Sequence, residues 1–137
     1  MTPDEATAFL RSAMPLCDTL DIRAAVARPD EVRLELDWAP GLCTSDDVLH
    51  GGVIMTLADS AGGACTYFNL PDGAAGTTTI ESKTNFLGAV RAGAAVATAR
   101  PLHLGGTTIV VETLVTDADD HPVAKVTQTQ LVLRRRA

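Results

Sequence analysis

The residues whose types and spacing could do chemistry lie together in the segment Leu49–Gly63. A His-Gly-Gly sequence, His50 to Gly52, opens an apolar stretch with helical periodicity, and one carboxylate, Asp59, follows two turns later. Free backbone N–H groups at a helix N-terminus stabilise developing negative charge. An isolated acid among apolar residues is costly to bury unless it is used or satisfied. An acid and an oxyanion-type site on one helix indicate acyl chemistry.

Small and polar residues form a second stripe on this helix. By i, i+3, i+4 spacing the stripe contains Gly52, Met55, Thr56, Asp59, Gly62 and Gly63. Each glycine weakens a helix by ~1 kcal/mol relative to alanine, so the stripe predicts close approach by a ligand or a partner backbone. Tight helix packing explains the glycines equally well. No Lys or Arg lies three or four residues from Asp59, although a surface carboxylate satisfied elsewhere is an alternative.

The rest of the chain predicts an antiparallel sheet around that helix, which should run over residues 51–68. A short helix is expected over residues 3–14, ended by Pro15. Alternating or β-branched segments predict strands at 20–27, 31–38, 77–86, 94–103, 107–117 and 122–133. Helices between successive strands are absent from the pattern, which excludes a parallel doubly wound fold. The expected class is α+β, with a curved sheet wrapped around one long helix.

Composition limits the class of partner. With 137 residues, 46% apolar, the chain is expected to form one domain over 1–137. Its net charge of −6 argues against general binding of nucleic acid or anionic membranes. No apolar run reaches the ~18 residues of a membrane span, and no signal-peptide pattern starts the chain, so a cytoplasmic protein is expected. The three cysteines and three histidines are scattered without metal-ligand spacing, so no metal is expected.

Two motifs carry a resemblance to a known family. The first is His-Gly-Gly-Val-Ile-x-Thr-Leu-Ala-Asp-Ser-Ala from His50, and the second is Thr-x-Glu-Ser-Lys-x-Asn-Phe-Leu-x-x-Val-Arg-Ala-Gly from Thr79. Together they resemble the hotdog-fold thioesterases of the phenylacetate-degradation (PaaI-like) type, which are related to one class of 4-hydroxybenzoyl-CoA thioesterase. The resemblance covers roughly residues 30–134 and implies a sheet wrapped around the helix, with active sites at a dimer interface.

The resemblance implies roles for four residues. Asp59 matches the catalytic acid, as general base or nucleophile, and Gly51 matches the glycine whose N–H polarises the thioester carbonyl. His50 matches the histidine that supports that loop, and Thr79 matches a Ser/Thr position that helps place the water or the acid. Within one chain Asp59 lies about 12–13 Å along the helix from Gly51, too far for both to reach one thioester carbon. The motif is therefore expected to supply halves of two sites in a dimer.

The chain departs from the family at Thr44, six residues before His50, where many members carry Asn or Gln. A missing oxyanion-type donor typically costs ~10²–10³ in rate. Coenzyme A is expected only as part of the substrate, not as a separate cofactor. Its phosphates need positive charge, and the plausible sources are Arg91, Lys83 and Arg100.

The expected reaction is hydrolysis of an aryl- or medium-chain acyl-CoA to free acid and CoA. A hotdog protein that binds acyl-CoA without cleaving it, a hotdog hydratase or dehydratase, and a purely structural oligomer are the alternatives. The acyl pocket is expected to draw on Met55, Leu57, Tyr67, Phe68 and the partner chain. A homodimer is expected, with a dimer of dimers as its further assembly.

Overall fold

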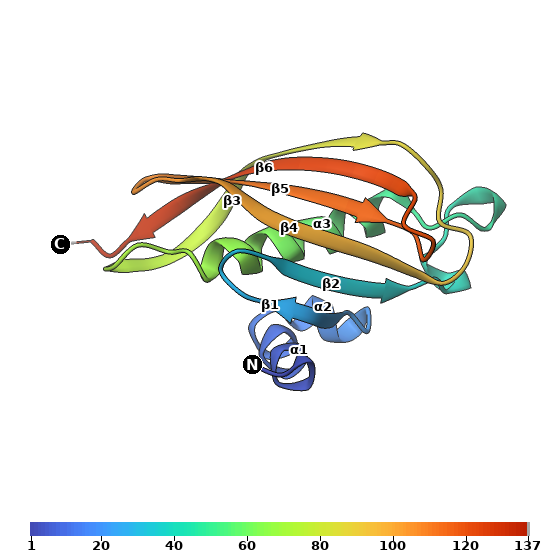
Figure 1. Cartoon of the computed structure of the whole chain (residues 1–137), viewed down its shortest axis with the longest axis horizontal. Helices are drawn as coiled ribbons and strands as arrows, with labels where there is room; N and C mark the ends of the chain where they lie inside the picture. The colour runs from blue at the N-terminus through green and yellow to red at the C-terminus, as the bar shows by residue number, and fades with distance from the viewer. Residues whose placement is uncertain (137) are drawn as a thin grey trace.

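The long helix α3 (Gly51–Tyr67) lies inside the curve of a six-stranded antiparallel sheet in the computed structural model, which describes residues 1–136 (Figure 1). The strands follow the order β1-β2-β4-β5-β6-β3 across the sheet. Their bounds are β1 (Arg23–Ala27), β2 (Val32–Asp37), β3 (Ala74–Phe86), β4 (Ala94–Leu104), β5 (Thr108–Thr116) and β6 (Pro122–Arg134). The hotdog architecture expected from the sequence is confirmed, and all six strands lie within a few residues of their predicted bounds.

One face of α3 forms the centre of the core. Its buried side chains include Ile54, Leu57, Ala58, Ala61 and Cys65. The strands meet this face with their own alternate residues, which is why β5 shows strict alternation between buried and half-buried positions. Many of the facing strand residues are alanine or valine, and their small side chains let the sheet approach the helix closely.

The N-terminal segment forms two helices rather than one. Helix α1 (Pro3–Ala13) begins with a reciprocal capping box between Thr2 and Glu5. Pro15 ends α1, as predicted, but it also occupies the first turn of a second helix, α2 (Pro15–Thr19), which the sequence analysis missed. Proline lacks the N–H that a helix start leaves unpaired, so the same residue ends one helix and begins the next.

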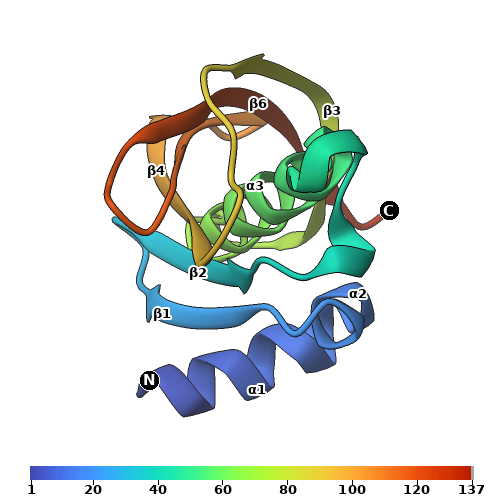
Figure 2. The ribbon, with the colours of Figure 1, turned by 90° about the vertical axis from the view of Figure 1, so that its right-hand side faces the viewer.

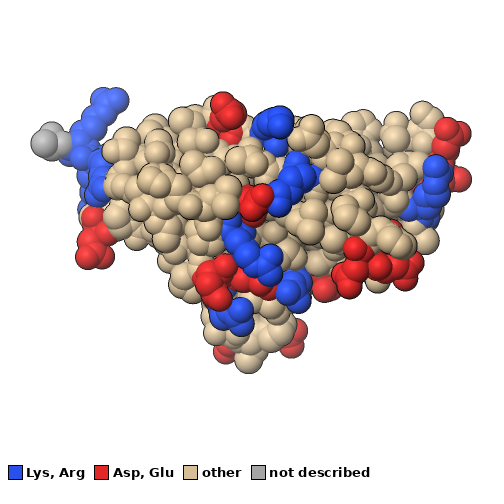
Figure 3. All heavy atoms as spheres, turned by 45° about the horizontal axis from the view of Figure 1, so that its top comes forward, with Lys and Arg blue, Asp and Glu red and all other residues tan. Residues whose placement is uncertain are grey.

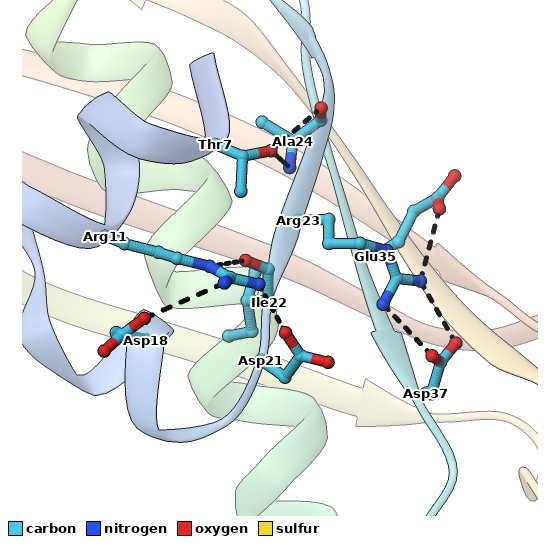
Figure 4. A network of polar contacts seen from close by, with 9 residues as sticks. All are labelled: Thr7, Arg11, Asp18, Asp21, Ile22, Arg23, Ala24, Glu35 and Asp37. Atoms are coloured by element: carbon cyan, nitrogen blue, oxygen red, sulfur yellow. Dashed lines mark hydrogen bonds and ion pairs between the residues drawn. The ribbon is translucent and has the colours of Figure 1, made fainter. Parts of the chain in front are cut away.

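The two edges of the sheet differ in how they are covered. Helix α1 lies along β1, where the Thr7 hydroxyl accepts a hydrogen bond from the Ala24 N–H at 2.9 Å (Figures 2 and 4). Arg11 donates from Nε to the Ile22 carbonyl at 3.0 Å. These contacts satisfy backbone groups that an edge strand leaves open. At the opposite edge β3 runs for 13 residues, most of them exposed.

Charged side chains are interspersed on the surface. On the face that Figure 3 shows, acidic and basic groups alternate between broad uncharged areas. Several of the basic side chains are paired with carboxylates, as Arg23 is with Asp37 at 3.0 Å (Figure 4). Among the described helices, none is long and apolar enough to cross a membrane.

Candidate active site

The first part of the site is the N-terminus of α3. The His50 imidazole caps this helix, with Nδ1 accepting the Gly52 N–H at 2.8 Å. The Gly51 N–H donates no hydrogen bond to any group in residues 1–136, so it is free to bind a ligand oxygen. A Cβ atom at Gly51 would lie 3.1 Å from Cζ of Phe86, a tighter contact than side chains normally make. The ring of Phe86 thus covers this turn closely because residue 51 is glycine.

The loop before α3 is held by three contacts from other elements. The Leu49 N–H donates to the Val90 carbonyl at 2.9 Å, which places Arg91 beside the start of the helix. Arg91 in turn donates to the carbonyl of Asp46 at 3.0 Å. The Trp38 indole donates to the carbonyl of the next residue in that loop at 2.9 Å. Arg91, predicted to meet the CoA phosphates, therefore lies at the end of α3 that carries the free N–H.

The second part of the site is the carboxylate of Asp59. Its side chain is exposed in the single chain, contrary to the expectation of a buried acid. Oδ1 accepts a hydrogen bond from the Thr79 hydroxyl at 3.0 Å and another from Nε2 of Gln128 at 3.2 Å. The structure thus brings Thr79 to the carboxylate, as the resemblance implied.

Two residues beneath this carboxylate, Gln128 and Gln130 on β6, were not predicted from the sequence. Both are essentially inaccessible to solvent, at 0% and 1% exposure. Nε2 of Gln130 donates to the Thr79 hydroxyl at 2.6 Å, and the Thr77 hydroxyl donates to Oε1 of Gln130 at 3.0 Å. The signal was present in the sequence, because strand alternation puts both amides on the same inward face as Val126 and Val132. Polar residues at core positions of a strand mark function more often than packing.

The two neighbouring glycines of α3 have different environments. A Cβ atom at Gly62 would lie 2.0 Å from Oε1 of Gln128, so only glycine at this position leaves room for the buried amide. A Cβ atom at Gly63 would meet nothing within 4 Å. Tight packing therefore explains Gly62, whereas Gly63 faces open space next to Asp59.

That open space is a cavity of about 400 Å³ between α1, α3 and β3. Its lining is almost entirely apolar or hydroxylic, and Asp59 is its one charged group among the described residues. The wall nearest α1 is aromatic, since Phe9 lies 5.6 Å from Tyr67 between ring centroids. Tyr67 lines the cavity as predicted, but Leu57 faces the sheet with 0% exposure, so its assignment to the pocket was wrong.

The remaining candidates for binding CoA lie apart. Lys83 is exposed on β3, whereas Arg100 on β4 donates to Glu31 at 2.6 Å, an ion pair that also includes Arg33. Arg100 thus shares with Arg33 a single carboxylate that is 11% exposed. Of the three basic candidates, Arg91 is the one that the backbone pairing before α3 places near its N-terminus.

The two buried cysteines are poor nucleophiles. Cys17 and Cys65 are fully buried, and burial raises the pKa of the Cys65 thiol to about 11. Burial likewise raises the pKa of the Cys17 thiol. Since the thiolate is the reactive form, neither side chain is suited to covalent chemistry at neutral pH.

A separate cluster forms at the turn between β5 and β6, where ligand-type atoms of Asp117, Asp119 and His121 lie within 4.8 Å of one another. The Asp117 carboxylate accepts the backbone N–H groups of Asp119 and His121, each at 2.9 Å. These hydrogen bonds lower the pKa of Asp117. They account for the cluster as the side-chain support of a tight turn.

Comparison with known proteins agrees with this geometry. Residues 46–124, more than half of the chain, match the family model of the thioesterase superfamily. The chain belongs to the thioesterase superfamily. The matched segment contains both ends of the site on α3 as well as Thr79, and it ends before Gln128. Family membership supports hydrolase activity.

Relatives of this thioesterase domain share its fold over nearly the whole chain. Rv1847 of Mycobacterium tuberculosis, named as a candidate esterase, is 28% identical over 126 residues, which are 90% of this chain and 89% of the relative. Its solved structure superposes with a TM-score of 0.85, covering 90% of this chain and 100% of that one. The Pseudomonas aeruginosa thioesterase PA1618, solved as a point variant, is 25% identical with a TM-score of 0.85 and covers 93% of each chain.

Proposed function

We propose that this thioesterase hydrolyses acyl-CoA thioesters with an uncharged, apolar acyl group, aromatic or of medium chain length. The observation that carries the proposal is Asp59, a carboxylate held at one oxygen by two donors at the mouth of an apolar cavity. A cavity of about 400 Å³ lies within the usual range for small-molecule sites. A charged acyl group would lie against apolar walls without a counter-ion there, which disfavours it.

In the proposed reaction Asp59 acts as general base. Oδ1 is occupied by Thr79 and Gln128, which leaves Oδ2 to accept a proton from water. The water oxygen attacks the thioester carbon, the C–S bond breaks, and the proton returns to the leaving sulfur. The negative charge on the carbonyl oxygen is stabilised by the free Gly51 N–H at the N-terminus of α3.

The two groups must come from different chains. Asp59 lies eight positions after Gly51 on the helix, about 12 Å away at the ~1.5 Å rise, which exceeds the reach of one thioester group. We therefore propose a homodimer in which the Gly51 N–H of one subunit faces the Asp59 of its partner. The long exposed β3 edge supports this arrangement, because an open edge of this length normally pairs with another strand.

The first experiment measures CoA release from a panel of aryl- and alkyl-CoA esters. We expect Asp59→Asn to lower kcat by about 10²–10⁴-fold, the usual contribution of a general base. Asp72→Asn removes an exposed carboxylate outside the site and should leave kcat unchanged. Tight binding of acyl-CoA without release of CoA would identify the protein as a binding module instead, and retained turnover in Asp59→Asn would remove Asp59 from the mechanism.

The oxyanion role can be tested by removing one hydrogen atom from the backbone. Gly51 is the first residue of α3, where proline is well tolerated, and His50 has φ −58° and ψ 135°, which suit a residue before proline. We expect Gly51→Pro to lower kcat by about 10²–10³-fold while the helix is retained. Gly51→Ala keeps the N–H and makes the same contact with Phe86, so it is the matched control. Equal losses in both variants would assign the effect to crowding.

A further inference from the structure

We propose that the buried amides of Gln128 and Gln130 are positioning residues that hold the Asp59 carboxylate in its reactive orientation. This inference rests on the proposed function, since it concerns the same carboxylate. Gln128 donates to Asp59 directly, and Gln130 acts through the Thr79 hydroxyl. Both amides come from the part of β6 after residue 124, where the match to the superfamily model ends.

The hydrogen bonds have a fixed direction. The ionised Asp59 carboxylate only accepts, so the Thr79 hydroxyl must donate to it and must itself accept from Gln130. This donation from Nε2 sets the orientation of the Gln130 amide, and its Oε1 then faces the Thr77 hydroxyl, whose single proton is shared with the Leu131 carbonyl. In the chain Gln130–Thr79–Asp59 each group therefore donates to the next, and the last hydrogen bond reaches Oδ1. With Oδ1 fixed, Oδ2 is the oxygen left to meet water.

Gln128 is costly for the fold, which argues that its role is functional. Its side chain is fully buried, and Oε1 accepts no hydrogen bond from the described residues. An unpaired buried carbonyl destabilises a protein, whereas an apolar side chain of the same size would not. The helix also keeps glycine at position 62, where alanine would collide with this amide. The unpaired carbonyl of Gln128 and the mid-helix Gly62 are both unfavourable for stability, and both accompany the hydrogen bond from Nε2 of Gln128 to Asp59.

The first experiment separates activity from stability in Gln128→Met. Methionine fills a similar volume without the donor or the unpaired carbonyl. We expect kcat to fall about 10–100-fold, as for a misplaced catalytic group, while KM changes less than about twofold and the urea midpoint stays equal or rises. Thr129→Ala, on the opposite face of β6, is the control for activity and should leave kcat and KM unchanged. A wild-type kcat in Gln128→Met would overturn the proposal for this residue.

A second route to the same effect leaves Gln128 in place. Gly62→Ala should displace its amide from Asp59, because the new Cβ would occupy the position of Oε1. We expect the kcat of Gly62→Ala to fall as in Gln128→Met. In a Gln128→Ala background, where the colliding side-chain atoms are gone, Gly62→Ala should cause no further loss of kcat. An independent further loss in the double variant would contradict a shared cause.

The relay through Thr79 is tested by a double-mutant cycle in kcat. If Gln130 acts through Thr79, then Gln130→Met should have no effect in a Thr79→Val background, although it slows the wild-type enzyme. Thr79→Ser retains the hydroxyl and should restore most of the activity lost in Thr79→Val. Multiplicative losses in the double variant would overturn the relay.

A measurement without turnover distinguishes this proposal from the proposed function. Gln128→Met should raise the urea midpoint more in an Asp59→Ala background than in the wild type, because the carboxylate partner is already gone. All variants are compared at one protein concentration, since oligomers unfold in a concentration-dependent way. Equal shifts in the two backgrounds would overturn the contact between Gln128 and Asp59. If wild-type protein releases no CoA, the proposed function fails, and this cycle still decides the contact.

Discussion

At the scale of single residues, the site depends on hydrogen-bond donors that stay free because neighbouring groups bind other partners. His50 uses its imidazole to cap α3, which ties up the Gly52 N–H and leaves the Gly51 N–H free. Arg91 uses one guanidinium N–H on the Asp46 carbonyl, and its remaining N–H groups form no hydrogen bond within residues 1–136. A guanidinium held in this way beside a helix N-terminus suits a phosphate group.

We predict that Arg91→Met raises the KM for acyl-CoA by about tenfold, the value of roughly one charge-assisted hydrogen bond. The matched control is a substrate, not a variant: an acyl thioester of N-acetylcysteamine has the same reacting group but no phosphates. Its KM should stay unchanged in Arg91→Met. An equal rise for both thioesters would mean that Arg91 supports the loop around Asp46 and does not bind CoA.

A second residue-scale prediction concerns the size of the acyl group. Gly63 faces the cavity, and a Cβ atom there would have no neighbouring atom within 4 Å, so a larger side chain fills the cavity without a clash. We expect Gly63→Val to favour short acyl chains over aromatic ones when kcat/KM is compared across the panel. The fold should remain intact, because a mid-helix glycine is itself unfavourable by ~1 kcal/mol. An unchanged order of substrates would place the acyl group elsewhere.

Individual side chains show where prediction from the sequence ends. Asp59 and Thr79 were identified by motif, and the structure joins them by a hydrogen bond. Gln128 was missed because its role depends on a hydrogen bond to Asp59. The two residues are 69 positions apart in the sequence and become neighbours only when the chain folds. Leu57 was misplaced because helical periodicity does not say which apolar face lines a cavity and which packs on strands.

At the scale of elements, the two sheet edges are treated in opposite ways. Edge β1 is covered by α1 through Thr7 and Arg11, and Arg11 is also paired with Asp21 (Figure 4). Edge β3 has no such cover in the described chain.

Strands and the long helix were predictable from local periodicity, but α2 was not, since five residues carry too little pattern. The edge that α1 covers was also not predictable, because it depends on strand order.

We predict that Thr7→Val lowers the free energy of unfolding by about 1–2 kcal/mol, since the N–H of the buried residue Ala24 loses its acceptor while the side-chain volume is kept. Urea unfolding checks this value. Ser12→Ala removes an exposed hydroxyl from the same helix and serves as the control. Equal stabilities for the two variants would mean that solvent replaces Thr7 at this edge.

At the scale of the whole molecule, the exposed β3 edge and the proposed division of the site point to the same partner, a second copy of the chain. Ile80 and Phe86 on β3 are 57% and 51% exposed, and apolar side chains on a long open edge favour association. Phe86 also covers Gly51, so the edge and the free N–H adjoin. A second copy of the chain along β3 would cover the apolar side chains and bring its own Asp59 towards the first copy.

Mixing two inactive variants tests this arrangement. Asp59→Asn and Gly51→Pro are each expected to inactivate both sites of a homodimer. If every site combines Gly51 of one subunit with Asp59 of the other, a mixed dimer has one site with both groups intact. Random re-pairing after unfolding and joint refolding makes half of the dimers mixed, so about a quarter of wild-type CoA release should return. If each chain held a complete site, both sites of a mixed dimer would lack one group, and no activity above that of the separate variants would appear.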